Sequence, residues 1–195
     1  MHMVIGVVSL KGGSGKTTSS IFLATCAALK GRGVTLVDAD EEQSSLAWAR
    51  FAELPFETVP AERDSLARQV RSLAQSGDVV IDTPPNNREM LMRTAMLADL
   101  IVVPVKPTGM DVDRLMPTLE LLRDAEATRG ALDVAILFTQ WDGRRVLSRE
   151  ATEALEGFPL LEARIRALAR YEQAFGTVPA YLDEYEQAWK ELIDG

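Results

Sequence analysis

The feature that most constrains this sequence is a glycine-rich loop near its start, placed between an apolar run and a helical pattern. Residues 11 to 18 read Lys-Gly-Gly-Ser-Gly-Lys-Thr-Thr and follow the apolar run Val4 to Ser9. Glycines let the backbone turn tightly and point successive N–H groups at phosphate oxygens, and the N-terminus of the next helix favours negative charge. The segment therefore predicts a phosphate-binding loop. Its nucleotide-binding candidates are Gly12, Gly13, Ser14, Gly15, Lys16, Thr17 and Thr18.

Two of these side chains have specific roles in such a loop. Lys16 is expected to reach the β- and γ-phosphates, and Thr17 is expected to place its hydroxyl on a magnesium ion bridging those phosphates. Lys16 is therefore also a catalytic candidate.

The rest of the chain alternates short apolar runs with helical spacing, which predicts an α/β fold. The expected strands are Val4 to Ser9, Val34 to Val37, Val79 to Ile81, Ile101 to Val105 and Val134 to Phe138. The expected helices are Thr17 to Lys30, Ser65 to Ala74, Val112 to Ala127, Ser148 to Leu155 and Tyr181 to Ile193. Because the strand runs are nearly continuous in apolar residues, we expect a doubly wound, mainly parallel sheet with helices on both faces. No linker marks a boundary, so residues 1–195 are expected to form a single domain.

Composition excludes several other kinds of protein. Cys26 is the single cysteine and His2 the single histidine, which excludes an internal disulfide, a histidine-based metal site and a Ser-His-Asp triad. The net charge of -8 argues against broad coating by nucleic acid but leaves a local basic patch open. Neither a signal peptide pattern nor an apolar run of membrane-spanning length is present, so we expect a cytoplasmic protein with no membrane partner.

The loop departs from the ordinary phosphate-loop pattern at two places. Leu10 stands where that pattern has glycine, and Lys11 is an additional lysine. In this respect the chain resembles the deviant Walker A family of ParA, MinD and the nitrogenase iron protein, whose signature lysine contacts nucleotide across a sandwich dimer. The resemblance implies that catalytic and nucleotide-binding role for Lys11. It also implies the P-loop NTPase fold, ATP and Mg²⁺ as cofactors, and a homodimer in the ATP-bound state.

Acidic residues follow two of the expected strands, as Val37-Asp38-Ala39-Asp40 and as Ile81-Asp82-Thr83-Pro84-Pro85. Ligands of doubly wound sheets lie just past such strand ends. The resemblance implies that Asp38 and Asp82 serve the magnesium ion with Thr17, and that Asp40 positions or activates the attacking water. The family usually has Pro-Gln where this chain has Glu41-Glu42, which leaves the water-positioning loop in question.

The resemblance further makes Gln140, after the run Val134 to Phe138, a candidate for contacting the adenine edge, with a solvated surface glutamine as the alternative. Six arginines gather in the last third of the chain, where they indicate either non-specific DNA binding through phosphates or a solvated charged surface. These DNA-binding candidates are Arg144, Arg145, Arg149, Arg164, Arg166 and Arg170.

Among the branches of the family, the short form of ParA fits best. The chain ends in a mixed, mostly acidic segment instead of the basic amphipathic helix of MinD, and Cys26 does not supply the ligands of an iron–sulfur cluster. Because the first strand is expected to begin at residue 4, we expect no helix-turn-helix domain before it.

The resemblance thus implies a nucleoid-associated ParA-type ATPase that dimerises with ATP and binds DNA non-specifically. Such an ATPase partitions plasmid or chromosome DNA or another large cargo, and a ParB-like or other small activator stimulates hydrolysis. The alternatives are an amide-forming synthetase of the cobyrinic acid or dethiobiotin type, a MinD-like positioning ATPase, and an adaptor that binds nucleotide without hydrolysing it.

Overall fold

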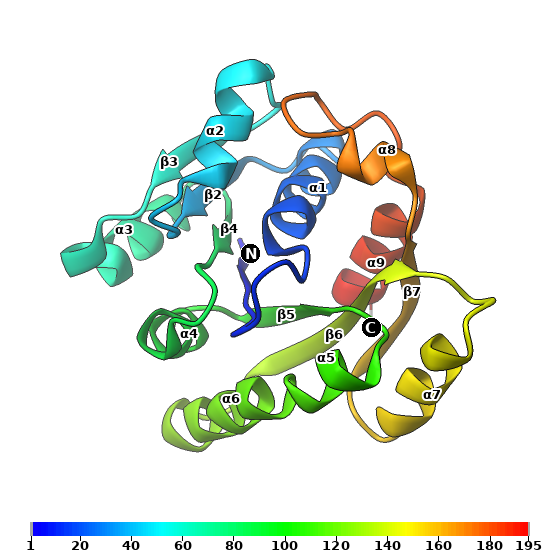
Figure 1. The fold of residues 1–195 in the computed structure, drawn as a ribbon. Helices are drawn as coiled ribbons and strands as arrows, with labels where there is room; N and C mark the ends of the chain where they lie inside the picture. Colours follow the sequence, from blue (N-terminus) through cyan, green and yellow to red (C-terminus); the bar gives the residue numbers. More distant parts are fainter. Residues whose placement is uncertain (1, 195) are drawn as a thin grey trace.

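A seven-stranded sheet with the order β3-β2-β4-β1-β5-β6-β7 forms the centre of the molecule (Figure 1). The structure is a computed structural model that describes residues 2–194. Every pairing between neighbouring strands is parallel. The strands are β1 (Val4–Val7), β2 (Val34–Asp38), β3 (Glu57–Pro60), β4 (Asp78–Asp82), β5 (Leu100–Val105), β6 (Asp133–Trp141) and β7 (Leu160–Arg166). The predicted α/β fold with a doubly wound parallel sheet is confirmed.

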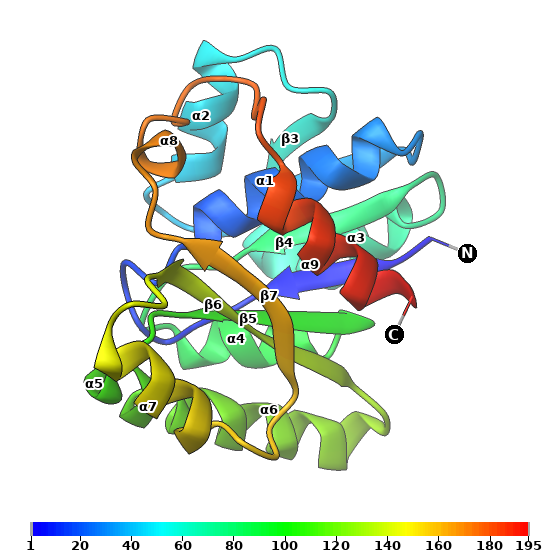
Figure 2. The ribbon, with the colours of Figure 1, turned by 90° about the vertical axis from the view of Figure 1, so that its right-hand side faces the viewer.

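Helices cover both faces of the sheet, and each face has its own apolar core (Figures 1 and 2). One core packs beneath α1 (Lys16–Leu29), α2 (Ser44–Phe51), α8 (Ala169–Glu172) and α9 (Asp183–Asp194). The other packs beneath α3 (Leu66–Leu73), α4 (Arg88–Ala95), α5 (Gly109–Asp113), α6 (Met116–Arg129) and α7 (Val146–Ala154), and a short 3-10 turn, η1 (Arg63–Ser65), precedes α3. Within residues 2–194, no helix is long and apolar enough to cross a bilayer.

The sheet brings the candidate site together at the carboxyl ends of its central strands. β1 lies between β4 and β5, and its last residue, Val7, is in register with Asp82 of β4. Asp38 at the end of β2 is in register with the same residue. Parallel strands therefore place both acids beside the loop that leaves β1.

The sequence patterns did not predict the strands and helices that are short or that are buried on one side only. The strands β3 and β7 and the helices α2, α4 and α8 were not predicted. β3 is an edge strand with partly exposed residues, and β7 alternates buried and exposed residues, so neither carries a continuous apolar run. The single helix predicted over 112–127 is two helices, because α5 ends at Asp113 and α6 starts at Met116 with a proline in its first turn.

Candidate nucleotide-binding site

The glycine-rich loop joins β1 to α1, as the sequence predicted. Gly13 and Gly15 have positive φ angles of 68° and 95°, a region that residues with a Cβ rarely adopt. The hydroxyl of Thr139, on β6, donates to the carbonyl of Ser14 over 2.8 Å, and a Cβ on Gly15 would lie 3.4 Å from the Thr139 side chain. The loop is thus fixed against β6 by Thr139. The helix α1 begins at Lys16, so its N-terminal N–H groups adjoin the loop.

Lys16 is buried inside the loop, with a relative exposure of 7%. Its Nζ donates to the carbonyl of Lys11 over 3.1 Å. Burial lowers the pKa of Lys16, whereas the charges of Asp82 and Asp40 raise it. The loop lysine therefore lies within electrostatic reach of both carboxylates.

Lys11 forms an ion pair within its own chain, with Asp111 of α5. The lysine side chain is 25% exposed and that of Asp111 6%, so the pair lies at the surface end of the loop. Burial, followed by the charges of Arg114 and Lys106, lowers the pKa of Lys11. Sequence reasoning missed this partner, which is distant in sequence and is aligned by the N-terminal turn of α5, where Thr108 accepts from the Asp111 N–H.

Asp82 is completely buried and has hydroxyl donors on both of its oxygens. Ser20 of α1 donates to Oδ1 over 3.1 Å, Ser45 of α2 donates to Oδ2 over 2.7 Å, and the Thr17 side chain also hydrogen-bonds to this carboxylate. Burial raises the pKa of Asp82 to about 6, although the hydrogen bonds from these hydroxyls lower it. Ser20 and Ser45 were not among the predicted site residues, because nothing in the local sequence reveals which acid a serine will contact.

Asp38 is also buried, and burial raises its pKa. Its two oxygens accept from the N–H groups of Leu46 over 2.9 Å and Asp40 over 3.1 Å. The hydroxyl of Thr17 and the carboxylates of Asp38 and Asp82 are hard oxygen donors, the kind that Mg²⁺ prefers beside phosphate groups. The donor set therefore fits a magnesium ion bound together with a nucleotide.

Asp40 lies one step further out, on the loop that leads to α2. It borders an open cavity of about 510 Å³ that the prolines Pro84 and Pro85 line from the other side. The segment after β4 is tied to the phosphate loop, because Thr83 Oγ1 donates to the carbonyl of Val7 over 2.8 Å and the Asn86 N–H donates to that of Leu10 over 2.9 Å. Asp40 thus borders an open space between the segment after β2 and the segment after β4.

Gln140 lies within β6, near its end, and not after the strand as predicted. Its φ of 53° is unusual for a residue other than glycine. It lines a small cavity of about 80 Å³ together with Gly15 and Thr18 of the loop and the apolar side chains of Leu168 and Tyr171. An amide and apolar walls therefore lie together beside the phosphate loop.

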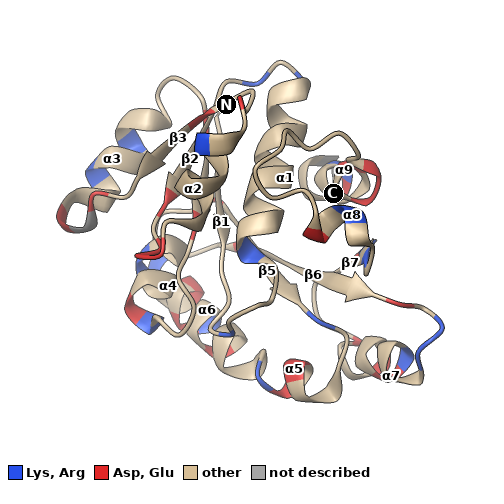
Figure 3. Cartoon of the chain, turned by 45° about the horizontal axis from the view of Figure 1, so that its top comes forward, with Lys and Arg blue, Asp and Glu red and all other residues tan. Residues whose placement is uncertain are grey.

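The six candidate arginines separate into two groups. Arg144, Arg145 and Arg149 are exposed near the junction of β6 and α7, where Arg144 and Arg145 pair with Asp142; Figure 3 shows this basic stretch far from α3. Arg166 and Arg170 form ion pairs with Glu184 of α9, and Arg164 stacks over the rings of Phe138 and Trp141. Among the described residues, the ion pairs of the first group lie within its own loop, whereas the second group is held against α9 and β6.

This geometry defines a class of protein. A glycine-rich loop between a buried parallel strand and a helix, with two buried carboxylates at the ends of neighbouring strands, is the site of a P-loop nucleotide-binding protein. The chain belongs to the CobQ/CobB/MinD/ParA nucleotide binding domain family, whose model matches residues 5–176.

Relatives and solved structures agree with this assignment. The chain is 34% identical to maintenance of carboxysome distribution protein A of Gloeobacter kilaueensis over 181 residues, which is 88% of this chain and 80% of that protein. It is 33% identical to protein ParA of Rhizobium radiobacter over 142 residues, covering 70% and 64% of the two chains. A plasmid partition protein from Borrelia burgdorferi bound to AMPPNP shares the fold, with a TM-score of 0.78, 19% identity and 98% coverage of both chains.

Proposed function

We propose that this protein is a ParA-type ATPase, a single-domain switch over residues 1–195 that ATP converts from monomer to dimer. The observation that carries the proposal is the relationship to ParA and to the carboxysome distribution protein, combined with a lysine before the double glycine of the loop. By analogy with these relatives, the protein distributes plasmid or chromosome DNA or another large cargo. A ParB-like or other small activator then resets it by stimulating hydrolysis.

ATP and Mg²⁺ are the cofactors that the site fits. The loop N–H groups and Lys16 hold the phosphates, and Gln140 with the apolar wall at Leu168 faces the base. Thr17, Asp38 and Asp82 are the residues that would hold the cation, and a bound Mg²⁺ would supply positive charge beside the phosphates. Asp40 is assigned to orient a water molecule; its charge acts on the loop lysine Lys16, which supports a position near the phosphates.

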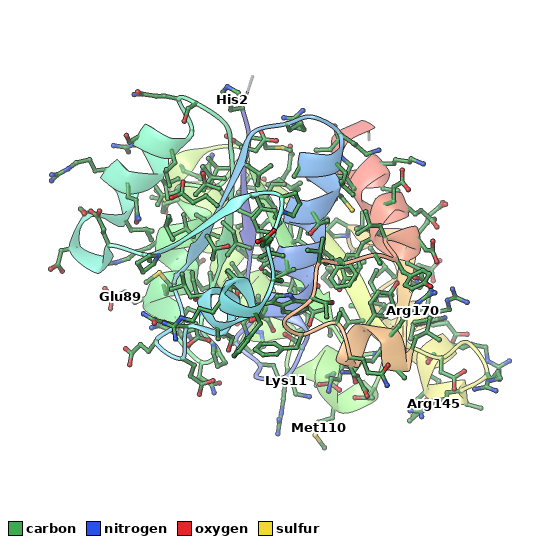
Figure 4. The ribbon with its side chains drawn as sticks, turned by 90° about the horizontal axis from the view of Figure 1, so that it is seen from above. His2, Lys11, Glu89, Met110, Arg145 and Arg170 are labelled. Carbon is green, nitrogen blue, oxygen red and sulfur yellow. The ribbon has the colours of Figure 1, made fainter. Side chains whose placement is uncertain are left out.

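Lys11 is the residue that we assign to dimerisation. In the isolated chain its ammonium group pairs with Asp111, and Lys11, Met110 and Arg145 lie along one edge of the molecule (Figure 4). Met110 is 64% exposed, although its neighbours Asp111 and Val112 are buried. A second subunit that meets this edge would cover an apolar side chain, and Lys11 would exchange its carboxylate partner for the phosphates of that subunit's nucleotide.

The dimer also brings two copies of the arginine group at 144, 145 and 149 onto one assembly, which favours non-specific DNA binding on the nucleoid in the ATP-bound state. The candidates Arg164, Arg166 and Arg170 contribute less to this surface, because they already contact Phe138, Trp141 and α9.

Sedimentation velocity with a non-hydrolysable ATP analogue tests the proposal. Wild-type protein should form dimers with the analogue, and Lys11→Ala should bind the analogue yet remain monomeric. Lys106→Ala is the matched control, because it removes one neighbouring positive charge and leaves the loop lysine in place. A Lys11→Ala dimer as stable as that of the wild type would remove the proposed switch.

The synthetase alternative makes a different prediction about turnover. A ParA-type switch should hydrolyse ATP faster when DNA and its partner protein are added together. An amide-forming synthetase should respond to a carboxylate substrate, and an adaptor should bind ATP tightly without turnover under any of these conditions. The relatives at 30% identity or more are carboxysome distribution proteins and a protein ParA, which favours the first outcome.

A further inference from the structure

The first turn of α2 contacts both of the buried carboxylates at once. Ser45 Oγ donates to Oδ2 of Asp82 over 2.7 Å, and the next residue, Leu46, donates its N–H to Oδ2 of Asp38 over 2.9 Å. Ser45 and Asp82 both have a relative exposure of 0%. A helix that is otherwise separate from the phosphate loop is therefore attached to the two acids of the cation site.

This attachment replaces the usual cap of the helix. The residue before α2, Gln43, has a left-handed φ of 51° and gives no side-chain cap. Helix N-termini need acceptors for their free N–H groups, and the carboxylate of Asp38 provides one here. Further along the helix, Trp48 Nε1 donates to the carbonyl of Thr177 over 2.7 Å. Because α2 is fixed at both points, the Ser45 hydroxyl is presented to Asp82 in a defined direction.

Ser20 and Ser45 approach Asp82 from different elements. Ser20 belongs to α1 and is therefore part of the phosphate-loop helix, whereas Ser45 follows the loop that carries Asp40. Together they donate to both oxygens of the Asp82 carboxylate, which fixes its rotation. An acid that serves a metal ion through a water molecule depends on this orientation, because partners beyond the direct ligands set the direction of its lone pairs.

We propose that Ser45 is a positioning residue for the magnesium site: its hydroxyl orients Asp82 and couples the segment after Asp40 to the cation. The proposal rests on the proposed function, since it concerns the same ATP site. It predicts a defect in the use of magnesium, and not in the recognition of the nucleotide itself. A serine that only filled space in the core would show no such selectivity.

The test is isothermal titration calorimetry with a non-hydrolysable ATP analogue over a series of Mg²⁺ concentrations, and in EDTA. Ser45→Ala removes the hydroxyl, and Ser45→Cys replaces it with a larger thiol that is only a weak hydrogen-bond donor. Ser44→Ala is the matched control, because it deletes a serine hydroxyl from the same turn that does not bond to the carboxylates. Thermal unfolding of each protein without nucleotide establishes that the fold is retained, and Ser45→Cys serves if Ser45→Ala does not fold.

Both Ser45 variants should need about tenfold more Mg²⁺ for half-maximal binding of the analogue, which is the lower end of the range for losing such an indirect partner. Their affinity for the analogue in EDTA should equal that of the wild type, and Ser44→Ala should match the wild type throughout. An unchanged Mg²⁺ requirement in folded Ser45 variants would overturn the role of Ser45, as would an equal loss of affinity in EDTA. Failure of the wild type itself to bind the analogue with Mg²⁺ would instead refute the proposed function, and this inference with it.

Discussion

The two ends of β4 carry buried acids whose substitution should change stability in opposite directions. At one end, Asp82 is completely buried and accepts hydrogen bonds from serine hydroxyls. Within the described residues, Asp82 forms no ion pair. At the other end, Asp78 forms an ion pair with Arg32 and accepts from the N–H of Met3 over 2.9 Å. Burial raises the pKa of Asp82, whereas the hydrogen bonds from Arg32 and Met3 hold the pKa of Asp78 below its ordinary value against the effect of burial.

The cost of ionising Asp82 follows from its pKa. The pKa rises from an ordinary 3.8 to about 6 in the folded chain. One pKa unit is about 1.36 kcal/mol, so the charged form of Asp82 lowers the free energy of unfolding by roughly 3 kcal/mol above pH 7. Because the folded chain binds this proton more tightly than the unfolded chain, that stability is present below about pH 4 and is lost as the pH rises through about 6.

Asp82→Asn keeps the shape of the side chain and removes the charge. We expect the variant to be more stable than the wild type by about 1–3 kcal/mol at pH 7.5 in the absence of nucleotide, and the difference to fall by about half at pH 5. Urea unfolding followed by circular dichroism measures both values. The same variant should lose Mg²⁺-dependent binding of an ATP analogue. The charge of Asp82 would then lower the free energy of unfolding and be needed for nucleotide binding.

Asp78→Asn is the matched control, because it makes the same chemical change on the same strand. It should be less stable than the wild type at pH 7.5, since it leaves Arg32 without its carboxylate partner. The contribution of Asp78 is present above its unfolded pKa and is lost as the pH falls through the lower folded pKa. An Asp82→Asn variant that is no more stable than the wild type at pH 7.5 would refute the reasoning about Asp82.

Four further sets of substitutions test the remaining proposals. Lys16→Ala should lose ATP binding, because Lys16 is the buried lysine of the loop. Asp40→Ala should bind ATP, accumulate as a dimer and release little phosphate. Phosphate release at the wild-type rate would remove Asp40 from the mechanism. Changing Arg144, Arg145 and Arg149 to Glu should abolish salt-sensitive retention of DNA in gel shifts and leave ATP affinity unchanged. The same change at Arg68 and Arg71 of α3 should leave DNA retention unchanged. Equal DNA retention in the two variants would exclude the first three arginines as the DNA-binding surface. Gly15→Ala should cost about 1–3 kcal/mol in urea unfolding, because its φ of 95° strains any residue with a Cβ, and unaltered stability would show that the loop relaxes.

The sequence by itself determined the phosphate loop and the central strands. The loop is a contiguous run of residues whose chemistry is local, and the buried strands carry continuous apolar runs, so both could be identified without knowing which segments meet. The acids Asp38 and Asp82 followed from their positions at the ends of such strands, and the register of β2 with β4 places them side by side.

Only the tertiary structure decided which partners these side chains have. Ser45 reaches Asp82 because a helix that local patterns did not reveal packs against β2 and β3, and Lys11 pairs with Asp111 because α5 lies beside the phosphate loop. Arginines of the last third of the sequence have different partners for the same reason, since Arg166 of β7 pairs with Glu184 of α9, whereas Arg144 pairs with Asp142 of its own loop. Hydrogen bonds and ion pairs depend on distances of a few ångströms between elements far apart in the chain, and those distances are set by packing and not by local sequence.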